Sequence, residues 1–164
     1  MKRILFLCTG NSCRSQMSEV IMNRLGKKKF EALSAGAKPV GYVHPLAIRV
    51  MQDAHLPTVG LRSKSWEEYQ GQPMDFVITV CDRAKETCPV WPGQPISAHW
   101  GFEDPADATG TDEEKLRVFR KIFTEIQARI QLFVALPMDK LSKLELQKKV
   151  QELGKKESHE EISR

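Results

Sequence analysis

Short apolar runs recur along the first two thirds of the chain, separated by segments with a different periodicity. Four of these runs have the length and the aliphatic or β-branched content that buried strands require. They predict strands at residues 3–7, 30–34, 76–80 and 96–100. The run at 76–80 gives the clearest strand pattern in the sequence, because it is β-branched over most of its length.

The intervening segments repeat their apolar residues at helical spacing. They predict helices at 15–28, 44–55 and 111–136, and a short helical turn at 66–69. The helix at 111–136 has the strongest pattern, since one face carries Phe119, Ile122, Phe123, Ile126, Ile130 and Phe133. It opens with Thr111 followed by three acidic residues, which predicts a capping box at its N-terminus.

Strands that alternate with helices predict an α/β fold built from parallel βαβ units. In such folds ligands bind beyond the carboxyl ends of the strands. Cys8 and Cys81 follow two of the predicted strands, and Asp104 follows a third. We therefore expect these three side chains to converge on one rim of the sheet.

Pro137 ends the predicted domain, 1–136, and a charged tail follows at 137–164. The tail has a thin apolar stripe that includes Leu146, Val150 and Leu153. A docked or partner-binding helix would explain this stripe, but we expect a partly helical tail that frays beyond Gly154.

The chain has 164 residues, of which 41% are hydrophobic and 28% charged, as expected of one globular domain. Its net charge of +4 is mild and gives no reason to expect nucleic-acid binding. The lysine run 27–29 is interpreted as a solvated helix end. No apolar run approaches the ~20 residues that cross a membrane, and the N-terminal run is too short for a signal peptide. We expect a cytoplasmic protein without membrane attachment.

The first strand leads directly into Cys8-Thr9-Gly10-Asn11-Ser12-Cys13-Arg14-Ser15. Backbone N–H groups at a turn into a helix form an anion site, and an arginine adds donors for two oxygens of one oxyanion. The same field is expected to lower the pKa of Cys8, with a hydrogen bond from Ser15 to its thiolate. Gly10 is expected to allow the tight turn, and Asn11 to pin the loop or adopt a left-handed conformation. A buried structural cysteine is the less favoured alternative.

These residues resemble the anion loop of the low-molecular-weight protein tyrosine phosphatase superfamily, Cys-five residues-Arg-Ser. The sequence from Cys8 to Glu19 is similar to that of the thioredoxin-coupled arsenate reductase branch of the superfamily. The resemblance implies a three-layer sandwich in which helices flank a four-stranded parallel sheet. It also implies that Cys8 is the nucleophile, that 9–14 form the oxyanion cradle and that Asp104 is the general acid.

Arsenate reduction differs from phosphate-ester hydrolysis in needing two electrons, which one dithiol supplies by becoming a disulfide. Cys81 and Cys88 meet that need, and by the resemblance they match the reductase relay. The expected cascade is a Cys8–arsenic adduct, a Cys8–Cys81 disulfide with release of arsenite, and a Cys81–Cys88 disulfide that thioredoxin or a similar dithiol reduces. Cys13 is a secondary candidate for protecting an oxidised Cys8. An inert cysteine pair and a zinc site are the weaker alternatives.

Asp104 and Pro105 lie in a stretch that matches the acid loop of the superfamily. The phosphatases usually carry an aromatic residue after this proline, whereas this chain has Ala106, which favours a small inorganic oxyanion. A phosphatase acting on phosphotyrosine through a Cys8 phosphoenzyme is the alternative activity. A non-catalytic oxyanion-binding or redox-sensing module is a third, which the intact set of Cys8, Arg14 and Asp104 argues against.

Some reductases of the branch bind potassium beneath the loop through Asn, Glu, Ser and Asp. Asn11, Glu19 and Ser34 fit that pattern, but Lys64 occupies the place of the Asp. The ammonium group of Lys64 is expected to replace the cation. We therefore expect no metal, no potassium requirement and no cofactor.

Overall fold

A parallel four-stranded sheet forms the centre of the protein in a computed structural model, which describes residues 1–81 and 91–162, with side chains through Lys155. The strand order is β2-β1-β3-β4. The strands span Lys2–Cys8 (β1), Phe30–Gly36 (β2), Phe76–Thr79 (β3) and Ile96–His99 (β4). Both central strands, β1 and β3, are fully buried over most of their length, which explains their continuous apolar sequences.

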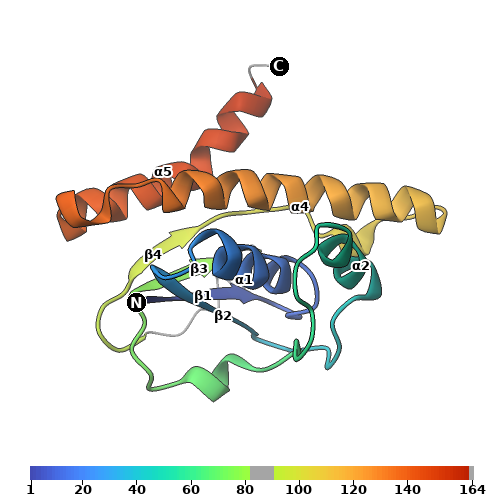
Figure 1. Ribbon diagram of the computed structural model, residues 1–164, viewed down its shortest axis with the longest axis horizontal. Helices are drawn as coiled ribbons and strands as arrows, with labels where there is room; N and C mark the ends of the chain where they lie inside the picture. The colour runs from blue at the N-terminus through green and yellow to red at the C-terminus, as the bar shows by residue number, and fades with distance from the viewer. Residues whose placement is uncertain (82–90, 163–164) are drawn as a thin grey trace.

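Helices flank this sheet, as predicted (Figure 1). They are α1 (Arg14–Leu25), α2 (Pro45–Asp53), α4 (Asp112–Val134) and α5 (Lys143–Ile162), with 3₁₀ turns at Trp66–Tyr69, Pro105–Asp107 and Met138–Lys140. Helix α4 runs the length of the molecule and packs on α1 and α2. Its predicted capping box is confirmed, because Thr111 and Glu114 bond to each other's backbone N–H groups.

Two predicted boundaries near the first two strands are wrong. Strand β2 continues to Gly36, two residues beyond the predicted end, because Gly36 pairs with Cys8. A Cβ atom at residue 36 would lie 2.6 Å from the carbonyl oxygen of Thr9, so only glycine allows this approach. Helix α1 ends at Leu25 with Gly26 as its C-cap, so Lys27-Lys28-Lys29 lies in the following turn rather than in the helix.

Helix α5 packs along β4, the edge strand of the sheet, and buries Leu146, Val150 and Leu153. The Gln147 side-chain amide bonds to both backbone groups of Ser97, with N···O distances of 3.0 Å and 2.6 Å. The helix continues through Gly154, where the sequence predicted fraying. This glycine sits against the carbonyl oxygen of His99. The far end of α5 projects from the body of the protein (Figure 1).

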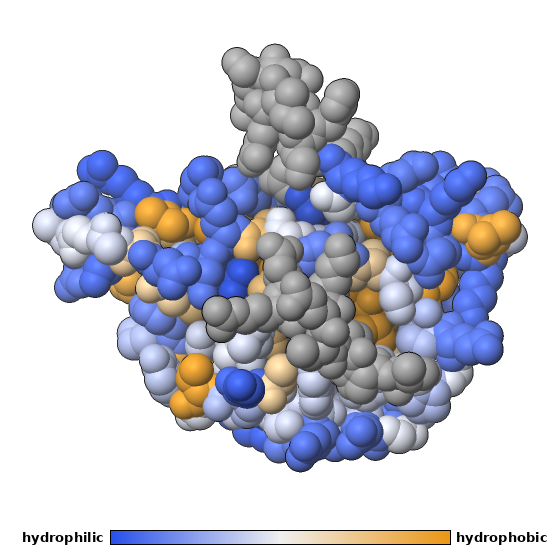
Figure 2. All heavy atoms as spheres, turned by 180° about the vertical axis from the view of Figure 1, so that it is seen from behind, coloured by the Kyte–Doolittle hydropathy of each residue, from blue (hydrophilic) through white to orange (hydrophobic). Residues whose placement is uncertain are grey.

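Few large apolar side chains are strongly exposed on the described surface. The most exposed of them, Met1, Tyr42, Val59 and Leu144, come from separate parts of the chain. The face drawn in Figure 2 is accordingly mostly hydrophilic, with apolar residues in small groups. No helix in the described part of the chain is long and apolar enough to cross a bilayer.

Candidate active site

Cys8 and Cys81 come together at the carboxyl ends of β1 and β3. These strands are neighbours with Leu7 paired to Thr79, so the two cysteines leave the sheet side by side. A hydrogen bond joins the two thiols. The Cys81 sulfur also accepts from the Thr9 N–H at 3.1 Å and lies 3.3 Å from Thr9 Oγ1. The second sulfur therefore lies at the first peptide of the predicted oxyanion cradle.

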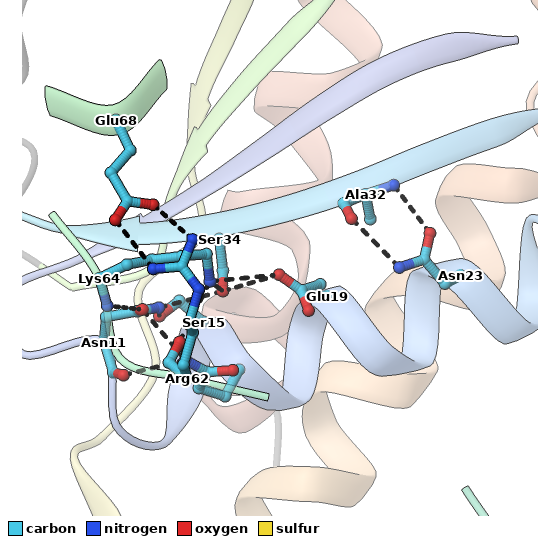
Figure 3. Close-up of polar contacts among 10 residues, drawn as sticks. Asn11, Ser15, Glu19, Asn23, Ala32, Ser34, Arg62, Lys64 and Glu68 are labelled. Carbon is cyan, nitrogen blue, oxygen red and sulfur yellow. Dashed lines mark hydrogen bonds and ion pairs between the residues drawn. The ribbon is translucent and has the colours of Figure 1, made fainter. Parts of the chain in front are cut away.

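Asn11 determines the shape of the cradle. It has φ = 49°, and its side chain is fully buried. Its amide nitrogen donates to Ser15 Oγ at 2.8 Å and to Ser34 Oγ at 3.0 Å (Figure 3). Its amide oxygen accepts from the Lys64 N–H at 2.9 Å and from Gln16 Nε2 at 3.0 Å. The left-handed residue of the turn is thus Asn11 and not Gly10, whose φ is not positive.

The hydroxyl of Ser15 is part of this support. We expected it to donate to the Cys8 thiolate, but its described contact is with Asn11. Ser15 is fully buried in the first turn of α1. That helix starts without an acidic first turn or a side-chain cap from Cys13, so its first N–H groups remain available to an anion.

The Arg14 guanidinium is held in place by the acid loop. Its Nη1 donates to the Phe102 carbonyl oxygen at 2.9 Å, and Nη2 lies 3.4 Å from Asp104 Oδ2. Its Nε is buried and has no hydrogen-bond partner among the residues that the structure describes. A buried donor without a partner is costly, and an oxyanion oxygen would satisfy it.

Asp104 lies close to Arg14 and is partly exposed. One carboxylate oxygen, Oδ1, accepts from the Ala106 N–H at 3.0 Å and caps the 3₁₀ turn. The other faces Arg14, and 34% of the side chain is open to solvent. A carboxyl group at this position can exchange protons with solvent and approach an oxygen of an anion that Arg14 binds.

The predicted lowering of the Cys8 pKa is wrong in this state of the site. The hydrogen bond with Cys81 and burial raise the pKa of Cys8 well above its usual value, although Arg14 and the Asn11 N–H lower it. The buried thiol pair outweighs the positive field that the loop sequence predicts. Burial also raises the pKa of Cys13 to about 11, so this thiol is protonated at neutral pH.

Lys64 occupies the centre of a polar cluster beneath the cradle (Figure 3). Its ammonium nitrogen lies 3.7 Å from Glu19 Oε1 and 3.4 Å from Ser34 Oγ. Burial lowers the pKa of Lys64 and raises that of Glu19, and in each the attraction of the other opposes the shift. This is the arrangement expected of an ammonium group in the place of a cation. Outside 82–90 and the end of α5, no group of three potential metal ligands is present.

Not every predicted site residue can be placed. Thr9, Gly10, Ser12 and Cys13 lie in the cradle loop, whereas Cys88 lies outside the described residues. Sequence reasoning missed the Phe102 carbonyl that holds Arg14. A backbone acceptor carries no sequence signal, so nothing in the pattern could have identified it.

The chain belongs to the low-molecular-weight phosphotyrosine protein phosphatase family, whose model matches residues 3–152. Among its relatives, the arsenate reductase of Halalkalibacterium halodurans is 42% identical over 132 residues, which cover 80% of this chain and 94% of that protein. The glutaredoxin arsenate reductase of Synechocystis is 33% identical over 135 residues, or 82% and 98% of the two chains. A solved arsenate reductase in the oxidised state superposes with a TM-score of 0.70 at 31% identity, covering 82% of this chain and 98% of that one.

Proposed function

We propose that this protein is an enzyme that reduces arsenate to arsenite with its own cysteines, and that residues 1–136 form the catalytic unit. The position of Cys81 is the observation that carries the proposal. Ester hydrolysis needs only one thiol and water, whereas here a second thiol is hydrogen-bonded to the nucleophile and to the cradle. Relatives named arsenate reductase support the same activity.

In the first step arsenate binds in the cradle, where the free Nε–H of Arg14 and the N–H groups at the start of α1 donate hydrogen bonds to its oxygens. The Cys8 thiol passes its proton to the bound arsenate, its sulfur attacks arsenic, and one arsenate oxygen leaves as water. Asp104 protonates the leaving oxygen, from its position beside Arg14. The product is a Cys8–arsenic adduct in which arsenic is still pentavalent.

In the second step the Cys81 thiolate attacks the Cys8 sulfur. A disulfide forms, the sulfur–arsenic bond breaks, and its electron pair stays on arsenic, which leaves as arsenite. Cys88 then attacks Cys81 and releases Cys8, so that the oxidation moves to a Cys81–Cys88 disulfide. An external dithiol protein of the thioredoxin or glutaredoxin type reduces this disulfide, and the cytoplasm supplies the reducing conditions for it.

Disulfide mapping after a single turnover tests the proposal. Fully reduced protein is mixed with arsenate without any reductant, and arsenite and disulfides are measured by mass spectrometry. We expect one arsenite per chain with a Cys81–Cys88 bridge, and no disulfide when phosphate replaces arsenate, since phosphate has the same shape but is not reduced. Cys88→Ser should also form one arsenite per chain, but it should retain a Cys8–Cys81 bridge.

Two outcomes contradict the proposal. Arsenite formation that persists in Cys81→Ser would remove Cys81 from the mechanism. Hydrolysis of aryl phosphates, with no arsenite formed by the wild-type protein, would instead assign the chain to the phosphatases of its family. Weak phosphatase activity accompanied by arsenite formation leaves the proposal intact, because both reactions begin with the same attack by Cys8.

A further inference from the structure

Arg129 is a charged residue in the core, far from the polar cradle in sequence. It lies in the second half of α4 and is only 4% exposed. Burying a guanidinium costs several kcal/mol, and an apolar residue of similar length fills such a space at lower cost. A buried charge at this position acts through the groups that it contacts, and two aromatic rings are among them.

Arg129 contacts two aromatic residues at the start of the acid loop. Its guanidinium carbon lies 4.7 Å from the ring centroid of Phe102 and 5.9 Å from that of Trp100, both within the range of a cation–π contact. Trp100 and Phe102 lie at the root of the loop that carries Asp104. The positive charge of Arg129 thus lies against the two aromatic rings at the start of this loop.

Phe102 connects this contact to the oxyanion cradle. Its carbonyl oxygen accepts from Arg14 Nη1 at 2.9 Å, while its own N–H makes, among the described residues, one long bond of 3.4 Å to the Val80 carbonyl. The backbone therefore holds residue 102 weakly. The fixed position of its carbonyl, and with it the orientation of the Arg14 fork, depends on how firmly the ring is held.

We propose that Arg129 is a positioning residue for oxyanion binding: it clamps the Phe102 ring, and the Phe102 carbonyl orients Arg14. In this proposal Arg129 acts on the anion through Phe102 and Arg14. The inference deepens the proposed function, on which it rests for the identity of the oxyanion. Inorganic phosphate is the probe, because its binding to the cradle can be measured whether or not the protein reduces arsenate.

Calorimetric titration of the reduced protein with phosphate tests this clamp. We expect Arg129→Met to weaken phosphate binding about 3- to 30-fold, the range of one desolvated cation–π contact. Arg129→Lys should recover part of the loss, because it keeps the cation. Arg120→Met is the matched control: Arg120 is also on α4, but it is exposed and pairs with Asp53, and phosphate affinity should not change.

Phe102→Leu separates positioning from a general loss of structure. This variant removes the ring and keeps the carbonyl, so it should weaken phosphate binding to a similar degree. If both residues act through one contact, adding Arg129→Met to Phe102→Leu should weaken binding by less than about a further 2-fold. It also preserves the test if Arg129→Met does not fold. Wild-type affinity in a folded Arg129→Met protein, or in Phe102→Leu, would overturn the proposal, as would fully additive losses. If the expected losses of phosphate binding are observed but no arsenite forms, only the proposed function fails.

Discussion

Replacing Asn11 with glycine or alanine separates two roles of this residue. Asn11 has a left-handed backbone and a buried side chain that bonds to four neighbours. Glycine keeps the backbone conformation without strain and removes the side chain. Alanine removes the same bonds and adds strain, because its Cβ atom disfavours positive φ.

The contacts determine how large each effect should be. In both variants Gln16 Nε2 can still donate to the backbone carbonyl oxygens of residues 11 and 62, but the buried backbone N–H of Lys64 loses its partner, the Asn11 side-chain oxygen. That unsatisfied donor costs about 1–3 kcal/mol, and the added freedom of glycine in the unfolded chain about 0.5–1 kcal/mol. We expect Asn11→Gly to lower the free energy of unfolding by about 1.5–4 kcal/mol. The left-handed strain of about 1–2 kcal/mol should place Asn11→Ala about 1 kcal/mol lower still.

Asn23 provides the matched control. Its amide also makes two hydrogen bonds to buried backbone, the N–H and carbonyl of Ala32, but it lies in α1 with right-handed geometry (Figure 3). There alanine should be more stable than glycine by about 1 kcal/mol, the helix preference. The ranking of the two substitutions should therefore invert between positions 11 and 23.

Urea unfolding followed by far-UV circular dichroism measures all four variants. The unfolding slope should stay constant, so that midpoints report stability. If Asn11→Ala is as stable as Asn11→Gly or more so, the left-handed strain is refuted. A wild-type midpoint for Asn11→Gly would show that the side-chain bonds contribute nothing.

Four further predictions follow from individual contacts. Cys81→Ala removes the largest influence that raises the pKa of Cys8, so iodoacetamide should alkylate Cys8 faster at neutral pH; an unchanged rate contradicts the thiol pair. Burial raises the pKa of Glu19, so ionising this carboxyl group destabilises the fold: its contribution to stability is complete below the unfolded pKa near 4.5 and is lost as the pH rises through the folded pKa. Glu19→Gln should flatten that part of the stability–pH profile, and an unchanged slope would refute this prediction. Gly154→Ala places a Cβ atom 2.3 Å from the His99 carbonyl oxygen and should cost about 1–3 kcal/mol in thermal unfolding, whereas Lys148→Ala on the exposed face should not. Arsenate turnover should be equal in potassium and sodium salts, because the Lys64 ammonium group lies against Glu19 and Ser34; strong stimulation by potassium would refute this.

Local patterns predicted most of the fold. The apolar runs at β1 and β3 are continuous because both faces of a central parallel strand are buried, and that burial leaves a direct trace in the sequence. The ends of elements were less predictable. Strand β2 extends to Gly36 because this residue pairs with Cys8, and the close approach of Thr9 requires glycine there. No window around residue 36 contains either neighbour.

The candidate site was likewise predictable only in part. The spacing of Cys8 and Arg14 predicted an anion loop, because backbone N–H groups, a helix start and an arginine occur within one short segment. The shift in the Cys8 pKa could not be predicted with the correct sign, since it depends on a hydrogen bond to Cys81 across the sheet. The support of Arg14 by Phe102 was also out of reach, because any residue supplies a carbonyl oxygen.

The pairing of Gln147 with Ser97 has a consequence for how the protein behaves at high concentration. An edge strand exposes peptide groups that can recruit a strand from another molecule, which is a common start of aggregation. A glutamine side chain has an N–H donor beside a carbonyl acceptor, as a peptide group does, and Gln147 presents both to Ser97. Helix α5 thereby ends the sheet with a side-chain substitute for a fifth strand. Truncation of the chain before Lys143 should therefore increase self-association through β4 relative to the full chain, measured as a rise in apparent mass with concentration.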